Sequence, residues 1–293
     1  MKNLVIGQSG GPTAVINASL YGAVKAFKES GTDGHVLGMI NGIEGFLADH
    51  VMDLSTDLSD EELELLKLTP AAYLGSCRYK LPADLESEVY PAIFDNFREM
   101  NIGYFLYVGG NDSMDTVDKL SRYAEKIGSD VKFIGIPKTI DNDLWGTELT
   151  FGFQSAIDIA STVIDSIHST AFSHSRVFIV EVMGHKVGWL TLYAGLAGGA
   201  DIILLPEIPY DINIVCDALT KRSKAGKRFS ILAVAEGAIS REDAKMSKKE
   251  LKEKKKSGVV YPSVAYEIGA KIQEVIGSEV RVTVPGHMQR GGE

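Results

Sequence analysis

Residues 3–13 read NLVIGQSGGPT, and this stretch indicates the fold class. Leu4–Gly7 is a continuous apolar run, as expected of a strand that is buried on both faces of a parallel sheet. The turn Gln8–Thr13 follows, and a helical pattern begins at Ala14. A strand that enters a helix through a tight glycine turn is the repeating unit of parallel α/β sheets.

The same alternation continues along the chain. Further strands are predicted at His35–Ile40, Tyr104–Val108, Lys132–Ile136, Val177–Val182, Ile202–Leu205, Ile231–Ala235 and Val280–Val284. Helices are predicted at Ala14–Glu29, Ser87–Met100, Ser113–Ile127, Ser155–Ser169, Val187–Leu196, Ile212–Ala225 and Ser263–Ile276. The pattern predicts a doubly wound α/β architecture. At about 150 residues per domain, the length of 293 residues predicts two domains, 1–150 and 151–293.

Charge, cysteine spacing and the length of apolar runs exclude several kinds of partner and cellular location. With 30 basic and 39 acidic residues the formal charge is −9, which argues against general binding to nucleic acid or to an anionic membrane. Cys77 and Cys216 lack C-x-x-C spacing, so a disulfide scaffold and a zinc ribbon are excluded and a reducing compartment fits. The N-terminal apolar run is too short for a signal peptide, and no apolar stretch is long enough to span a bilayer. We expect a cytoplasmic protein.

The lysine-rich stretch from Lys245 to Lys256 is the one strongly biased segment. A charge run of this kind is typical of a solvated helix or a flexible excursion, and less typical of a partner-binding patch.

Two glycine turns follow predicted strands. Gly10 and Gly11 come after the first strand, and Gly109–Ser113 comes after the strand Tyr104–Val108. Glycines let the backbone approach a phosphate, and the following helix N-terminus offers free N–H groups. Neither turn matches the P-loop or the dinucleotide fingerprint. Two such turns in the same relative place favour phosphate binding over tight turns alone.

A third strand end carries carboxylates. After Lys132–Ile136 the chain reads Pro-Lys-Thr-Ile-Asp-Asn-Asp, so Thr139, Asp141 and Asp143 share one face if the segment is extended. Two carboxylates and a hydroxyl there would supply a general base and a metal ligand, and Lys138 would supply a charge for phosphate. The alternative is a surface turn, in which Asp-Asn-Asp is common.

Other polar side chains lie near strand ends and glycines. They are Arg78, Arg176, Glu181, His185, Glu236, Arg281, His287 and Arg290. Glutamate, histidine and arginine in these positions suit the hydroxyls and phosphate of a sugar phosphate. The histidines show no metal spacing such as H-E-x-x-H.

Taken together, these motifs resemble the phosphofructokinase family, glycolytic kinases that phosphorylate the 1-hydroxyl of fructose 6-phosphate with magnesium. The matching blocks are SGGPTAVINAS, LGSCRYK, GGNDS, PKTIDND, SHSRVFIVEVMGH, AGGAD, PE, AEG and VPGHMQRGG, in the family's order. The resemblance implies two Rossmann-like domains, with residues 1–150 holding the phosphoryl donor and magnesium and residues 151–293 holding the sugar phosphate.

The resemblance also implies roles for single residues. Asp141 is expected to be the general base, Thr139 to contact the transferred phosphoryl, and Arg78 to steady it. Donor binding is expected of Gly10, Gly11, Asn111, Asp112, Ser113 and Lys138, and magnesium binding of Asp112 and Asp143. Sugar-phosphate binding is expected of Met183, Gly184, His185, Glu236, His287 and Arg290, with Arg176 and Arg281 matching arginines that a neighbouring subunit supplies. A homodimer or homotetramer is therefore expected.

Two positions discriminate the donor. Family members that use ATP have glycine where Asp112 and Lys138 stand, whereas those that use inorganic pyrophosphate have aspartate and lysine. We therefore expect pyrophosphate as donor, with ATP as the alternative. A catalytically silent sugar-phosphate-binding subunit is a third hypothesis, against which Thr139, Asp141 and Asp143 together argue.

The chain departs from the family pattern at three places. Asn111 replaces an aspartate near magnesium, and His185 replaces an arginine. The family continues beyond QRGG with a segment that returns to the first domain, so Arg290–Glu293 is expected to be a stub of that return segment.

Overall fold

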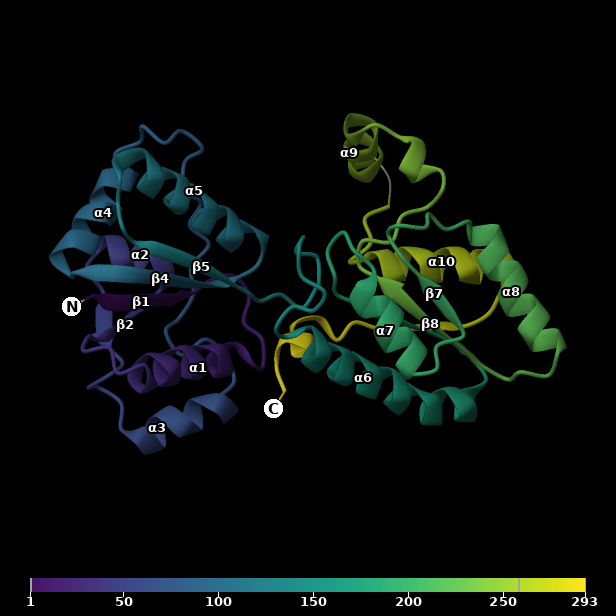
Figure 1. Ribbon diagram of the computed structural model, residues 1–293. Coiled ribbons are helices and arrows are strands. Elements are labelled where there is room, and N and C mark those ends of the chain that lie inside the picture. The colour runs from purple at the N-terminus through teal and green to yellow at the C-terminus, as the bar shows by residue number, and fades with distance from the viewer. Residues whose placement is uncertain (1, 258, 293) are drawn as a thin grey trace. The chain divides into compact units, whose positions relative to one another are not determined.

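The computed structural model describes residues 2–257 and 259–292 of the chain. The chain divides into two compact units, Met1–Ser155 with Arg290–Glu293, and Ala156–Gln289 (Figure 1). Each unit contains its own sheet with helices on both faces, so the predicted α/β class and the largely parallel sheets are confirmed.

The sheet of the first unit has the strand order β3-β2-β1-β4-β5. Its strands are β1 (Asn3–Gln8), β2 (Val36–Met39), β3 (Val51–Asp53), β4 (Ile102–Gly109) and β5 (Lys132–Pro137). All neighbours are parallel except β2 and β3. Parallel strands end at the same edge, so the segments that follow β1, β4 and β5 come together there.

Helices cover both faces of this sheet. They are α1 (Ile16–Glu29), α2 (Gly42–Leu47), α3 (Asp60–Leu65), α4 (Val89–Glu99) and α5 (Asn111–Ile127). Aliphatic side chains of α1 and of Leu63 in α3 pack on one face, with Ile6 and Val108 of the strands. On the other face an aromatic cluster joins Phe94 and Phe97 of α4 to Phe105 of β4. Figure 1 shows α1 and α3 on the side of the sheet away from α4 and α5.

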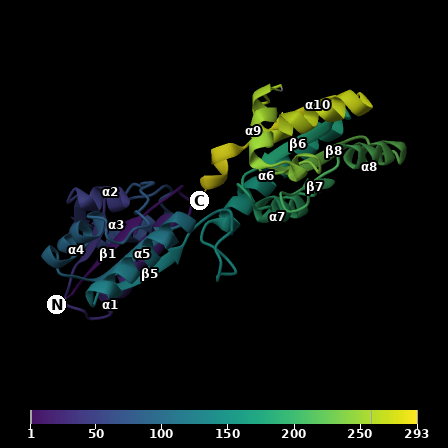
Figure 2. The same ribbon diagram turned by 90° about the horizontal axis from the view of Figure 1, so that it is seen from above.

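The sheet of the second unit is wholly parallel, in the order β7-β8-β6-β9. Its strands are β6 (Val177–Val182), β7 (Ile202–Leu204), β8 (Ser230–Ala235) and β9 (Val280–Thr283), and its helices are α6 (Phe153–His174), α7 (Trp189–Ala197), α8 (Ile212–Lys224), α9 (Lys248–Ser257) and α10 (Val264–Ile276). Side chains of α8 and α10 pack against Ile179 and Leu232, and Figure 2 shows α10 lying alongside β6. On the other face Gly195 of α7 approaches Ala233.

Every predicted strand and helix is present in the described residues, with ends shifted by a few positions. Strand β3 and helices α2 and α3 were not predicted, because each is too short to show a hydrophobic period. The lysine-rich stretch forms α9 (Lys248–Ser257), in agreement with the solvated-helix interpretation. Among the described residues no helix has the length and apolar character needed to cross a membrane.

Candidate active site

The turn after β1 is fixed by a second loop, residues 75–78. Gly10 has φ +76°, a conformation that only glycine adopts without strain. Its N–H donates to the Cys77 carbonyl at 3.2 Å, and the Ser76 hydroxyl donates to the Gly10 carbonyl at 2.6 Å. The predicted phosphoryl-steadying residue Arg78 is therefore held next to the glycine turn.

The turn after β4 leads directly into α5. Gly110 is the residue before the helix, and Asn111, Asp112 and Ser113 form its first turn. A Cβ atom on Gly109 would collide with the Ser113 side chain, so this close approach of strand and helix requires glycine. The first turn of a helix presents backbone N–H groups and a positive dipole, which suits an anion.

The segment that follows β5, residues 138–143, does not continue in the extended conformation that would place Thr139, Asp141 and Asp143 on one face. The backbone of Lys138 still pairs with Gly109 and forms a parallel bridge to Phe151. Beyond it the Thr139 hydroxyl accepts the N–H of Asp141 at 3.1 Å, and Asn142 adopts φ +54°. The chain turns here because side chains of Thr139 and Asn142 bond to nearby backbone. Simple alternation therefore does not decide which side chains share a face.

Lys138 brings a buried cation to the glycine turn. Lys138 is only 3% exposed, and its Nζ donates a hydrogen bond to the Gly11 carbonyl at 2.5 Å. Burial lowers its pKa to about 8, repulsion by Arg290 adds to the lowering, and attraction by Asp141 opposes it. A lysine with this pKa is still mostly protonated at neutral pH, and a bound anion would relieve its desolvation.

Arg290 lies at the same turn. A Cβ atom on Gly11 would displace the Arg290 guanidinium, so glycine at this position leaves room for the arginine side chain. Arg290 was expected near the sugar 6-phosphate, and the structure brings it to Gly11 and Lys138 of the first unit. Two neighbouring cations at a glycine turn form a strong site for phosphate oxygens.

The acidic side chains at this edge have different partners. Asp143 accepts a hydrogen bond from the Asn111 amide at 2.7 Å, whereas Asp112 forms an ion pair with Lys80 at 2.9 Å. Within residues 2–257 and 259–292 no cluster of three or more His, Cys, Asp or Glu is placed to hold a metal. Mg²⁺ is usually bound by one or two carboxylates together with substrate phosphates. Asp143 beside Asn111 fits that mode, and Asp112 faces a lysine instead.

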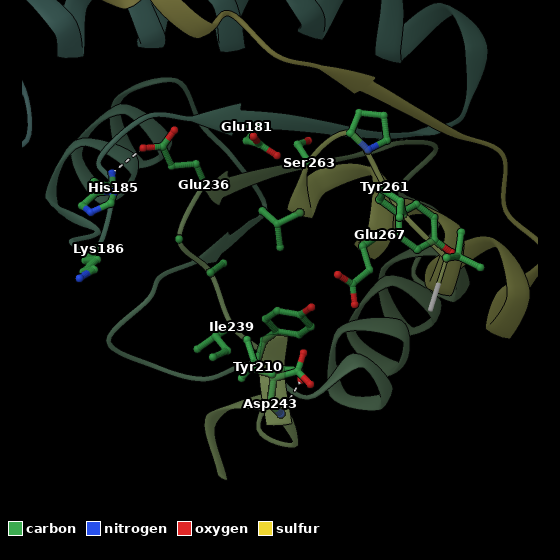
Figure 3. A pocket seen from close by; sticks show the side chains of 18 residues that line it. Glu181, His185, Lys186, Tyr210, Glu236, Ile239, Asp243, Tyr261, Ser263 and Glu267 are labelled. Atoms are coloured by element: carbon green, nitrogen blue, oxygen red, sulfur yellow. Dashed lines mark hydrogen bonds between the residues drawn. The ribbon is translucent and has the colours of Figure 1, made fainter. Parts of the chain in front are cut away.

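The second unit contains a cavity of about 700 Å³ at the carboxyl edge of its sheet (Figure 3). Glu236 follows β8 and accepts the N–H of His185 at 2.6 Å. This bond ties the loop after β6 to the end of β8. Both residues line the cavity, and both were predicted sugar-binding residues.

Glu181 lines the same cavity and has an unexpected partner. It is a carboxylate in the otherwise apolar strand β6, only 7% exposed, and it accepts the N–H of Ala265 in the first turn of α10 at 2.8 Å. The helix N-cap residue Ser263 makes no capping bond, and its hydroxyl is buried without a hydrogen-bond partner among the described residues. Glu181 therefore replaces Ser263 as the cap of α10.

Gln289 links two of the predicted sugar-binding segments. Its side-chain oxygen accepts the N–H of Met183 at 3.2 Å, and its amide donates to the Gly286 carbonyl at 3.0 Å. The loop carrying Met183 and Gly184 is thus joined to the short 3₁₀ turn that carries His287. Gln289 was not predicted from the sequence, because its role depends on a contact between segments that are distant along the chain.

Arg176 and Arg281 lie away from these residues. Both pair with Glu279, at the start of β6 and β9. His185 and Glu236 instead follow the ends of β6 and β8. At about 3.3 Å per residue, Arg176 is roughly 20 Å along the strand from the loop after β6. The two arginines of one chain therefore cannot reach a small sugar held at its own carboxyl edge.

Comparison with known proteins accounts for this set of motifs. The family model described as phosphofructokinase matches residues 3–293. The chain belongs to the phosphofructokinase family. The ATP-dependent 6-phosphofructokinase of Spirochaeta thermophila is 42% identical over 293 residues, covering 97% of this chain and 76% of that protein. ATP-dependent 6-phosphofructokinase 3 of Bacteroides thetaiotaomicron is 37% identical over 291 residues, covering 97% and 77%.

Solved phosphofructokinases share the fold of this chain. The pyrophosphate-dependent phosphofructokinase from Nitrosospira multiformis superposes with a TM-score of 0.85 at 31% identity, covering 99% of this chain and 70% of that one. The pyrophosphate-dependent enzyme from Marinobacter aquaeolei gives 0.84 at 32% identity, covering 100% and 70%. The predicted phosphofructokinase fold is confirmed.

Proposed function

We propose that this phosphofructokinase transfers a phosphoryl group from inorganic pyrophosphate to the 1-hydroxyl of fructose 6-phosphate, with magnesium, giving fructose 1,6-bisphosphate. The observation that carries the choice of donor is the buried ammonium of Lys138 at the Gly10–Gly11 turn. It offers a compact charge for a compact, highly charged donor. Asp112 in the first turn of α5 adds bulk where a nucleotide has to pass.

The first unit supplies the donor half of the chemistry. Asp141 takes the proton of the attacking hydroxyl as the oxygen bonds to phosphorus and the bridging P–O bond of pyrophosphate breaks, releasing phosphate. Thr139 contacts the transferred phosphoryl, and Arg78 offsets its charge. The backbone of the Gly10–Gly11 turn and the first turn of α5, including Ser113, hold the donor.

Magnesium would be held by Asp143, with the amide of Asn111 beside it. When bound it would neutralise phosphate charge during transfer. Asn111 contributes less charge than the aspartate usual in the family, so Asp143 carries more of the binding. Asp112 is the weaker candidate ligand, because Lys80 already compensates its carboxylate.

The second unit supplies the sugar half. Glu236 uses one carboxylate oxygen to hold the His185 N–H, which orients its other oxygen for a sugar hydroxyl. Met183, Gly184 and His287 complete this half, joined through Gln289.

Arg176 and Arg281 are assigned to the 6-phosphate in a neighbouring copy of the chain, within a homodimer or homotetramer. Arg290 retains its assignment to phosphate binding, either of sugar or of donor.

ATP is the second candidate donor. Relatives as close as 42% identity are named ATP-dependent, whereas the pyrophosphate-dependent names belong to solved structures at 31% and 32%. The competing observation lies in this chain, which has aspartate and lysine at positions 112 and 138.

Parallel assays distinguish the donors. Purified protein is supplied with fructose 6-phosphate and magnesium and with either pyrophosphate or ATP, and formation of fructose 1,6-bisphosphate is measured. We expect kcat/KM to be higher with pyrophosphate. Equal or higher kcat/KM with ATP would overturn the donor and leave the reaction standing. Binding of fructose 6-phosphate without turnover on either donor would favour the silent-subunit hypothesis.

A further inference from the structure

Lys80 is a charged residue beside the donor half to which no role has yet been given. Its Nζ lies 2.9 Å from Asp112 Oδ1, and the two side chains are 70% and 69% exposed. An ion pair as exposed as this one contributes little to folding stability, because solvent screens it. Stability alone is therefore a poor reason for this pair at the first turn of α5.

The backbone around Lys80 is firmly held. Tyr79 and Leu81, its two neighbours, pack into the aromatic cluster of the first unit, and Leu81 is 3% exposed. From α5, Lys119 donates to the Leu81 carbonyl at 3.0 Å and to Asp115 at 2.6 Å. The backbone at Lys80 is thus anchored against α5, and its exposed side chain reaches Asp112 in the first turn of that helix.

This position changes the charge that a donor meets. Alone, Asp112 would place a full negative charge at the helix turn where phosphates approach. An ammonium at 2.9 Å converts that charge into a local dipole whose field falls off faster with distance. The bulk of the Asp112 side chain remains, so a nucleotide is still obstructed while the charge opposing a compact phosphate donor is removed.

We propose that Lys80 is a specificity-determining residue that neutralises Asp112 and thereby admits a phosphate donor past an otherwise repulsive carboxylate. The inference rests on the proposed function, because it concerns how the donor enters. Lys80 acts through Asp112, so its effect depends on the negative charge at position 112.

The test is a double-mutant cycle on donor binding. Lys80→Met, Asp112→Asn and the double variant are compared with wild type by calorimetric titration of pyrophosphate and of ATP, and by KM for donor and sugar. Lys80→Met is expected to weaken the better-bound donor about tenfold, with kcat and the KM for fructose 6-phosphate within about twofold. In the Asp112→Asn background the same substitution is expected to have almost no effect. Lys80→Arg is expected to bind donor like wild type.

Lys126→Met is the matched control, because Lys126 pairs with Glu86 near the other end of α5. It should leave donor binding unchanged. An equal loss from Lys80→Met with and without the charge at position 112 would overturn the neutralisation. So would unchanged donor binding in Lys80→Met. If wild type prefers ATP, pyrophosphate is the wrong donor. The double-mutant cycle then still tests the role of Lys80, because the ATP titrations measure it.

Discussion

Lys138 is a lysine that lies almost wholly buried beside the Gly10–Gly11 turn. Burial lowers its pKa from 10.5 to about 8, so the donor should bind best when the group is still protonated, below about pH 8. Above that pH the free enzyme loses this charge, and kcat/KM for the donor should fall by about tenfold per pH unit. A pH profile of kcat/KM between 6.5 and 10 measures this. Lys138→Arg, which stays charged, is the control: an identical decline in that variant would assign the decline to another group.

The same pKa shift affects folding stability in the opposite direction: donor use is expected to fall as pH rises, whereas this group's contribution to stability is expected to improve. Below about pH 8 Lys138 is charged in the folded and unfolded chains, and only the folded chain bears the desolvation cost. Between about 8 and 10.5 the unfolded chain holds the extra proton, so this group's contribution to folding stability improves as pH rises. Comparing urea unfolding of wild type and Lys138→Met across this range would reveal it. A difference that stays constant with pH would contradict the shift.

Asp141 is the proposed base, and its replacement tests the chemistry at a single atom. Asp141→Asn keeps the size of the side chain and removes its capacity to accept a proton. We expect kcat to fall by about 10²–10⁴-fold, with little change in the KM for fructose 6-phosphate. Asp118→Asn, on the exposed side of α5, is the control and should be silent. A variant at position 141 that keeps most of its turnover would rule out the base assignment.

At the scale of elements, the strand ends were predictable because their signals are local. Apolar runs such as Tyr104–Val108 and the glycines after them lie within a few residues of one another, and parallel pairing brings such ends to one edge. The turn at Asn142 was not predictable, because its left-handed conformation depends on a bond from Thr150. Contacts such as Asp112 with Lys80, or Met183 with Gln289, join residues far apart in sequence, and no local pattern carries them.

The cap of α10 is a further element whose stability depends on a distant side chain. Glu181→Ala leaves the Ala265 N–H without its acceptor and removes a charge at the helix N-terminus, a loss of about 1–3 kcal/mol. Glu181→Gln retains an acceptor and should cost less. Hydrogen exchange of the amides in the first turns of α10 measures this locally, which suits a chain of two units. Glu274→Ala, exposed on the same helix, is the control. Exchange that is equally slow in Glu181→Ala and wild type would show that Ala265 is held by other contacts.

At the scale of the whole molecule, the proposed sugar-phosphate role of Arg176 and Arg281 predicts more than one copy of the chain. Both pair with Glu279 at the amino-terminal edge of the second sheet, opposite the edge that carries His185 and Glu236. A homo-oligomer in which these arginines complete a neighbour's sugar site resolves the separation. Sedimentation or light scattering of the purified chain should show a dimer or a larger assembly.

Mixing two inactive variants then tests whether sites are shared. Arg176→Ala lacks the donated arginine, and Asp141→Asn lacks the base. In a hybrid dimer one site receives Asp141 from its own chain and Arg176 from the other, whereas the second site lacks both. With random exchange in a symmetric dimer, half of the dimers are hybrids with one complete site each, so about a quarter of wild-type activity should return. Refolding each variant alone is the control and should give no recovery. No activity in the mixture, after mass spectrometry has verified hybrid formation, would show that each chain builds its site alone.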